Sequence, residues 1–199
     1  MKKVILYIHG KGGNARKAEQ YKPNFPDCDI YGVDYPDDFP WIVQEKILAA
    51  YNRLHETYDC ISVLANSIGA YFSMHTLQKA DIKRAFFISP ILDMERLIQD
   101  MMRWAGVSEE ELLKKGEIPT NFGEILSWKY LCYVREHPIS WRVPTEILYG
   151  EKDAMTALQT VKKFVDIHNS HLTIMKEGEH WFHTKEQLAF LNDWLKSVV

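Results

Sequence analysis

The chain has 199 residues, enough for one domain or for one domain with a modest insertion. Hydrophobic residues make up 46% and charged residues 26%, an ordinary composition for a globular protein with a buried core. The net charge of −3 gives no electrostatic reason to expect nucleic acid or an anionic membrane as a partner. Apolar runs stay below the roughly 18 residues of a membrane span. Nothing in the composition predicts an oligomeric state.

The cysteines and the first residues bear on the compartment. Cys28, Cys60 and Cys132 are widely spaced, odd in number and without a CxxC pair, which favours reduced thiols over a disulfide framework. The start, MKKVILYIHG, begins like a signal peptide, but its apolar run ends after about five residues, short of the 7–15 that such a peptide needs. We therefore expect a cytoplasmic protein whose first apolar run is a strand.

Short apolar runs alternate with helical patterns along the chain. The expected strands are residues 4–8, 30–33, 61–65, 85–88, 146–149 and 172–175. Most are continuously apolar, as strands covered on both faces are. Amphipathic patterns over 43–54, 158–165 and 188–198 predict helices, two of them beginning at the capping boxes Thr156-x-x-Gln159 and Thr184-x-x-Gln187. The alternation predicts an α/β protein: a three-layer sandwich with a mostly parallel sheet of about six strands.

Residues from about 93 to 143 break this alternation. They contain no good strand but three helical patterns: one from Met94, one from Ser108 to Gly116, and one over 121–138. We interpret them as a helical insertion within a single domain of residues 1–199. Most aromatic and Met side chains here are expected to bury the insertion's own helices, with two or three left to line an apolar pocket: Met101, Met102, Trp104, Phe122, Trp128, Tyr130, Tyr133 and Trp141.

Reactive residues follow four of the expected strands. Open parallel sheets bind ligands beyond the carboxyl ends of their strands, so residues at these points should gather at one edge. The turn HGKGG, residues 9–13, follows the first strand, and Asn66-Ser67-Ile68-Gly69 follows the third. Asp153 and His180 come after the last two strands.

Ser67 stands between small residues in the run ANSIGA, with Ala65 in place of the first glycine of G-x-S-x-G. A sharp strand-to-helix turn needs such neighbours, and it would present the hydroxyl at the N-terminus of a helix, where developing negative charge is favoured. The alternative interpretation is an ordinary helix N-cap, a position that serine also favours.

A serine nucleophile needs a base, and the base needs an acid. His180, in GEHW, is the candidate base because imidazole titrates near neutral pH, and His183 is its rival. Asp153, in YGEKD, is the candidate acid. Asp93 is an alternative that also suits the N-cap of a helix, and Glu151 is a weaker one.

Taken together, these motifs carry a resemblance. The order Ser, Asp, His and the runs HGKGG, ANSIGA, YGEKD and GEHWF resemble the α/β-hydrolase superfamily over nearly the whole chain. The resemblance implies that fold without the first two strands of larger members, and a helical cap at the insertion. It also implies a serine hydrolase that uses Ser67, Asp153 and His180 without cofactor or metal. The oxyanion hole would be the backbone N–H groups of Ile68 and Lys11. The expected substrate is a small to medium carboxylic ester, with a thioester or amide left open.

Two other functions remain open at this point. Gly10-x-Gly12-x-x-Ala15 after a strand, with Asp34 at the end of the next strand, also fits the dinucleotide-binding fingerprint of an NAD(P)-dependent oxidoreductase. That interpretation leaves the serine, aspartate and histidine unexplained. A hydrolase fold can also serve as a non-catalytic binding protein.

A metal site is a weaker alternative. His168-x-x-His171 and His180-x-x-His183 could each chelate a metal on a helix. No neighbouring cysteine or carboxylate completes a recognisable ligand set, so we expect neither metal nor cofactor.

Overall fold

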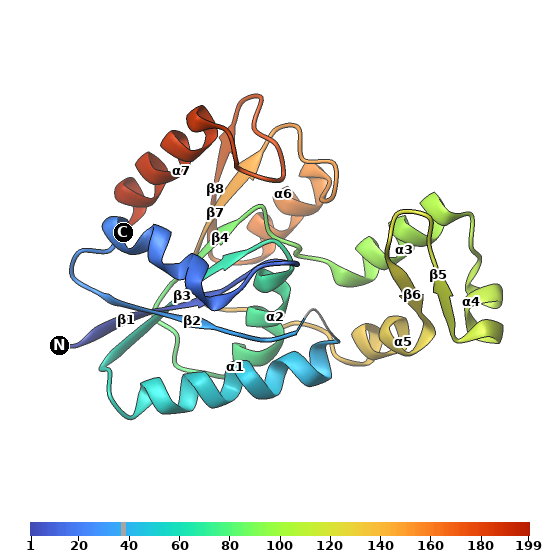
Figure 1. Cartoon of the computed structure of the whole chain (residues 1–199), viewed down its shortest axis with the longest axis horizontal. Coiled ribbons are helices and arrows are strands. Elements are labelled where there is room, and N and C mark those ends of the chain that lie inside the picture. Colours follow the sequence, from blue (N-terminus) through green and yellow to red (C-terminus); the bar gives the residue numbers. More distant parts are fainter. Residues whose placement is uncertain (37–38) are drawn as a thin grey trace. The chain divides into compact units, whose positions relative to one another are not determined.

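A computed structural model describes residues 1–36 and 39–199 (Figure 1). The chain divides into two compact units. The larger comprises Met1–Leu92 and Ser140–Val199, and the smaller comprises Asp93–Ile139. In the part of the chain that the structure describes, no helix has both the length and the apolar character needed to cross a membrane.

The larger unit is built on a six-stranded sheet in the order β2-β1-β3-β4-β7-β8, in which every neighbouring pair is parallel. The strands are β1 (Lys3–Ile8), β2 (Asp29–Val33), β3 (Cys60–Asn66), β4 (Ala85–Ile88), β7 (Thr145–Gly150) and β8 (Ser170–Met175). All six predicted strands are confirmed. The central strands β4 and β7 are buried along their whole length, which explains their continuously apolar sequences.

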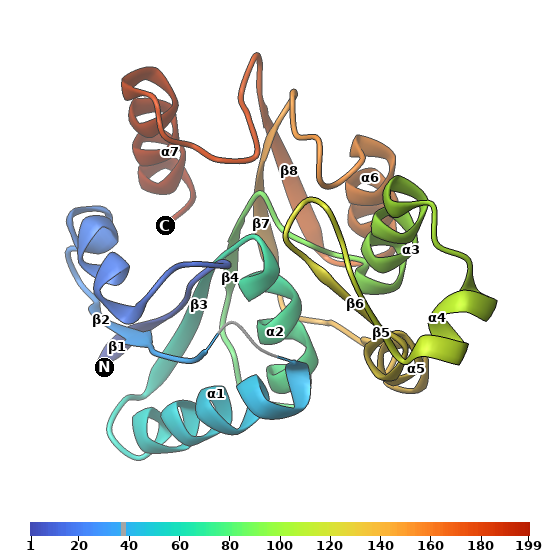
Figure 2. The same ribbon diagram turned by 45° about the vertical axis from the view of Figure 1, so that its right-hand side comes forward.

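Helices cover both faces of this sheet, which confirms the three-layer prediction (Figure 2). The 3₁₀ helix η1 (Ala15–Asn24) and α7 (Lys185–Val198) lie on one face; α1 (Pro40–His55), α2 (Ile68–Leu77) and α6 (Leu158–Ile167) lie on the other. The core under η1 and α7 includes Tyr7, Tyr21 and Trp194. The sequence does not predict η1, because this segment is polar on average and contains Pro23.

The two predicted capping boxes have different outcomes. Thr184 caps α7, since its side chain accepts a hydrogen bond from the Gln187 N–H. The prediction for Thr156 is wrong: α6 begins at Leu158 after the N-cap Ala157, which makes no side-chain cap bond. The Thr156 hydroxyl instead donates to the Pro90 carbonyl.

The smaller unit contains α3 (Met94–Ala105), α4 (Glu109–Lys115), β5 (Glu117–Pro119), β6 (Ile125–Ser127) and α5 (Trp128–Glu136). Asp93 and Ser108 cap α3 and α4, and Gly116 ends α4. The expectation of three helices without a strand is wrong in one respect. Residues predicted to begin the third helix instead form β6, which pairs antiparallel with β5. Strands of three residues are too short to show an alternating pattern.

One arginine links the three helices of the smaller unit. Arg135 on α5 donates to Glu95 on α3 at 2.7 Å and to both carboxylate oxygens of Glu109 on α4 at 2.9 and 2.6 Å. The two hydrogen bonds to Glu109, and after them the positive charge of Arg135, lower the pKa of the Glu109 carboxyl. The same unit exposes Trp104 and Phe122, which touch edge to face.

Candidate active site

Ser67 lies at the junction of β3 and α2 in a conformation that few residues other than glycine adopt. Its φ is 51° and its ψ is −122°, outside the favoured regions for an L-residue. The turn is held by its own backbone: the Ser67 N–H donates to the Ile88 carbonyl, and the Ser67 carbonyl accepts from the N–H groups of Ala70 and Ile91. Such a strained serine points to a functional role.

The turn requires a small residue after Ser67 because another segment passes close to it. A Cβ atom on Gly69 would come within 2.5 Å of the carbonyl oxygens of Ile8 and His9. Glycine at this position therefore lets α2 begin directly against the end of β1.

Three side chains from three loops form one hydrogen-bonded line. Ser67 Oγ lies 2.9 Å from His180 Nε2, and His180 Nδ1 lies 2.7 Å from Asp153 Oδ2. With the imidazole proton on Nδ1, Ser67 donates to His180 and His180 donates to Asp153. The Asp153 side chain is fully buried, and that of His180 is 18% exposed. A buried carboxylate can thus hold the imidazole in the tautomer that accepts the serine proton.

The loops that carry Asp153 and His180 contact each other through their backbones. The Lys152 N–H donates to the Gly178 carbonyl at 2.7 Å, and the Glu151 N–H donates to the Met175 carbonyl at 3.0 Å. A Cβ atom on Gly150 would lie 2.5 Å from the Glu179 carbonyl oxygen. Glycine at position 150 therefore allows the close approach that brings the two side chains together.

The turn after β1 lies against Ser67. A Cβ atom on Gly10 would stand 3.2 Å from the Cβ of Ser67. The Gly13 N–H donates to the Gly10 carbonyl at 3.0 Å and Gly12 has a φ of 67°, so residues 10–13 form a tight turn with Lys11 as its second residue. Ile68 is the first residue of α2, so its N–H has no acceptor within the helix.

A buried ring pair supports this turn. His9 is buried; its Nδ1 donates to the Gly10 carbonyl at 2.8 Å, and its ring stacks on Tyr35 with centroids 3.9 Å apart. The Tyr35 hydroxyl donates to the His9 carbonyl.

The rival residues have other hydrogen-bond partners. His183 is exposed and its Nδ1 donates to the Trp181 carbonyl at 2.6 Å. Asp93 caps α3, and Glu151 accepts from the Glu177 N–H. The ring of His180 is bonded instead to Ser67 and Asp153.

The structure around the glycine-rich turn does not fit the dinucleotide-binding fingerprint. That fingerprint needs an α-helix directly after the glycine-rich turn, whereas η1 is a 3₁₀ helix. Asp34, the residue expected to bind a ribose, accepts a hydrogen bond from the Ala15 N–H at 2.7 Å. A Cβ atom on Gly32 would lie 2.2 Å from the Ala15 carbonyl oxygen, so β2 and the start of η1 are already in close contact.

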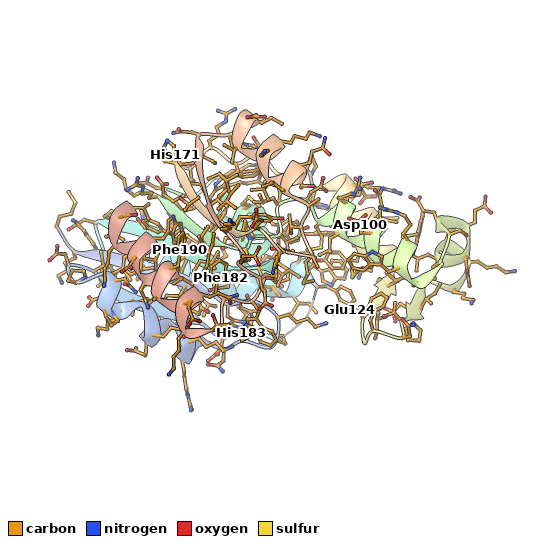
Figure 3. All side chains as sticks on the ribbon, turned by 90° about the horizontal axis from the view of Figure 1, so that it is seen from above. Asp100, Glu124, His171, Phe182, His183 and Phe190 are labelled. Atoms are coloured by element: carbon orange, nitrogen blue, oxygen red, sulfur yellow. The ribbon has the colours of Figure 1, made fainter. Side chains whose placement is uncertain are left out.

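The histidine pairs do not form ligand clusters among the described residues, where no group of three or more His, Cys, Asp or Glu side chains could hold a metal ion. His168 Nδ1 donates to the Trp141 carbonyl at 2.8 Å, and His171 faces Glu146. His171 and His183 lie apart in Figure 3, one on β8 and the other just before α7. Trp141 itself belongs to the larger unit, where it is buried and donates to Thr145.

Three residues around the site were not singled out from the sequence as part of it. Tyr35 supports the turn after β1, and Tyr149 and Thr156 surround the Asp153 loop. A tyrosine at the end of an apolar strand is the only signal for Tyr149, and it is a weak one.

Comparison with known proteins bears on the fold. No protein-family model matches the chain, and no curated protein matches its sequence. Solved structures do match. Est1E from Butyrivibrio proteoclasticus superimposes with a TM-score of 0.80 at 16% identity, over 98% of this chain and 86% of that one. Est1E with bound ferulic acid gives 0.76 at 15%, over 98% and 86%.

A third match is α/β-hydrolase domain-containing protein 10 from mouse, with a TM-score of 0.77 at 14% identity, over 98% of this chain and 88% of that one. Similarity at such low identity establishes the fold. The chain has the α/β-hydrolase fold, as the motifs of its sequence predict.

Proposed function

We propose that this α/β-hydrolase-fold protein is a serine hydrolase that cleaves carboxylic esters through an acyl-enzyme on Ser67. The observation that carries the proposal is the line from Ser67 Oγ through His180 to the buried Asp153, with separations of 2.9 and 2.7 Å. Its members lie on three separate loops, and the serine is held at a φ that costs free energy. A helix cap would need neither feature.

In the proposed mechanism, Ser67 Oγ attacks the carbonyl carbon of the ester while His180 Nε2 takes the hydroxyl proton. Asp153 stabilises the imidazolium through the bond to Nδ1. The carbonyl oxygen becomes an oxyanion, for which we propose the backbone N–H groups of Ile68 and Lys11 as donors. Backbone donors suit this task because they are uncharged and preorganised.

The tetrahedral intermediate collapses when the bond to the leaving alkoxide breaks and His180 returns the proton to the leaving oxygen. Water then attacks the acyl-enzyme, again with His180 as base, and releases the acid and Ser67. These steps require no cofactor.

For the substrate we propose an ester of a small to medium, partly apolar acid. Est1E binds ferulic acid, an aromatic acid, in one of the matching structures. Beside the proposed triad, Trp181 and Met155 are 75% and 41% exposed, so apolar surface adjoins the loops that carry His180 and Asp153. The three free cysteines favour a cytoplasmic location.

The first test is labelling with a fluorophosphonate probe, followed by peptide mapping of the modified residue. We expect labelling at Ser67 that is lost in Ser67→Ala and in His180→Ala. The matched control is His183→Ala, which removes an exposed imidazole three residues away and should label normally. Absence of labelling in folded wild-type protein, or labelling at another residue, would overturn the proposal.

A further inference from the structure

A strained turn follows β4, next to the proposed nucleophile. Ser89 has a φ of 45° and is buried, and the next residue is proline. A positive φ is unfavourable for residues other than glycine, and the residue before a proline is restricted further, so this conformation persists only where its surroundings enforce it.

Three hydrogen bonds hold the turn. The Ser89 N–H donates to the Leu148 carbonyl at 2.8 Å, and the Ile91 N–H donates to the Ser67 carbonyl at 3.0 Å. The third comes from a side chain, since the Thr156 hydroxyl donates to the Pro90 carbonyl at 3.2 Å. The turn therefore touches the backbone of Ser67 on one side and Thr156 on the other.

Thr156 also holds the acid. Its N–H donates to Asp153 Oδ1 at 3.0 Å, beside a second bond of 2.8 Å from the Met155 N–H. Its carbonyl accepts from the Tyr149 hydroxyl at 2.7 Å. Burial, and after it the charge of Asp153, raises the pKa of Tyr149 to about 12, so this phenol remains a proton donor throughout the neutral range.

We infer that Thr156 and Tyr149 are positioning residues that fix Asp153 relative to Ser67 through the turn at 89–91. This inference rests on the proposed function. A path of hydrogen bonds runs from the Asp153 carboxylate through Thr156 to the Pro90 carbonyl. The next residue, Ile91, then donates its N–H to the Ser67 carbonyl. This path connects acid and nucleophile without passing through His180. The imidazole is thereby placed between two groups whose separation is already set.

Helix capping does not account for Thr156. The N-cap of α6 is the next residue, and it makes no side-chain bond. Thr156 is buried; its hydroxyl donates to the Pro90 carbonyl in the turn after β4, and its carbonyl accepts from Tyr149 on β7. Small displacements of reacting groups reduce rates strongly, so the loss of one such bond should be measurable in kcat.

The test compares Thr156→Val, which replaces the hydroxyl by a methyl group, with Thr156→Ser, which keeps it. Turnover of 4-nitrophenyl butyrate is measured over pH, along with thermal unfolding. For Thr156→Val we expect kcat to fall roughly 10- to 100-fold with KM within about twofold. The acidic limb of kcat/KM should move to lower pH, because a misplaced Asp153 stabilises the imidazolium less. Thr156→Ser should retain kcat within about threefold.

The matched control is Thr145→Val. Thr145 is likewise a buried threonine, on β7, whose hydroxyl accepts from Trp141 Nε1 and donates to the Val143 carbonyl at the opposite end of the sheet. It should lower the melting temperature without changing kcat or the pH profile. If Thr156→Val does not fold, Tyr149→Phe provides the test instead. It removes the hydroxyl that donates to the Thr156 carbonyl, and it should also lower kcat.

The outcomes separate the two proposals. Normal kcat in folded Thr156→Val, or the same loss in Thr145→Val, would overturn the inference while the proposed function stands. A wild-type protein that neither turns over the ester nor reacts with the fluorophosphonate would overturn both.

Discussion

Ser67 and His180 are 113 positions apart in the sequence, yet Ser67 Oγ and His180 Nε2 are 2.9 Å apart. Parallel strands cause this convergence, because every carboxyl end of β1, β3, β4, β7 and β8 meets the same edge of the sheet. The third member of the line, Asp153, is the one whose charge must be compensated, since its side chain is fully buried.

Substituting Asp153 by asparagine should therefore remove activity while keeping the fold. An amide cannot supply the negative charge that stabilises the imidazolium, and it favours the wrong imidazole tautomer. We expect kcat to fall on the order of 10⁴-fold with a similar circular dichroism spectrum. Asp93→Asn is the control, because Asp93 is exposed and only caps α3. A comparable loss in Asp93→Asn would mean that the acid has been misassigned.

Gly69 should tolerate no side chain. A Cβ atom there would meet two backbone oxygens at 2.5 Å, and backbone cannot rotate away as a side chain can. We expect Gly69→Ala to lower the free energy of unfolding by about 3 kcal/mol. Each kcal/mol lost should lower the melting temperature by about 2–4 °C. Gly12→Ala is the comparison. Its position has open space but a φ of 67°, so about 1 kcal/mol is expected. Equal losses in the two variants would contradict the steric explanation.

Arg135→Lys should loosen the smaller unit alone. Lysine cannot form the two parallel bonds that Arg135 makes to Glu109. We expect faster hydrogen exchange in peptides from residues 93–139 and unchanged exchange in β1, β3 and β7. Uniform acceleration over the whole chain would contradict this.

The same ion pair gives the smaller unit a pH dependence. The pKa of Glu109 is lowered from its ordinary 4.5, mainly by the hydrogen bonds from Arg135. A lowered folded pKa means that the stabilisation is present above pH 4.5 and is lost as the pH falls through the lower, folded value. Protection factors, which correct the observed exchange for its slower intrinsic rate in acid, should therefore fall in residues 93–139 as the pH drops below 4.5, and less so in Arg135→Lys. A pH response of the same size in the variant would show that other groups cause it.

NAD and NADP should not stabilise the protein. A ligand at 100 times its Kd raises the unfolding free energy by about 2.7 kcal/mol, which thermal unfolding detects easily. We expect no shift, because Asp34 already bonds the Ala15 N–H and no α-helix follows the turn. A clear upward shift with either nucleotide would restore the oxidoreductase alternative.

The sequence predicts most of the larger unit because its signals are local. Continuous apolar runs mark buried parallel strands, and Thr184 marks the start of α7 by the spacing of one capping box. Where the prediction fails, tertiary contacts override local preference. Thr156 has the spacing of a cap but its hydroxyl bonds Pro90, a residue 66 positions away.

The order of Ser67, Asp153 and His180 along the chain and the small residues beside Ser67 are enough to propose the members of the site. They do not predict which other residues hold those members in place. No pattern in the sequence indicates that Tyr35 stacks on His9, or that Ser89 has a positive φ. Such contacts depend on which strands become neighbours in the sheet. That order is set by tertiary packing in the folded core, which local sequence patterns do not reveal.

The inserted segment also has a consequence for anyone who wishes to shorten or exchange it. Because β4 and β7 are adjacent and parallel, Ala85 pairs with Thr145, and the chain leaves one strand at the carboxyl edge and re-enters the next at the amino edge. The segment is thus the crossover of this strand pair as well as a separate unit. Any segment that replaces it must still carry the chain from the carboxyl edge of the sheet back to the amino edge. That distance is at least the length of β4, which has four residues and spans about 13 Å. A short hairpin, which suffices to replace an insertion between antiparallel strands, would disconnect this sheet.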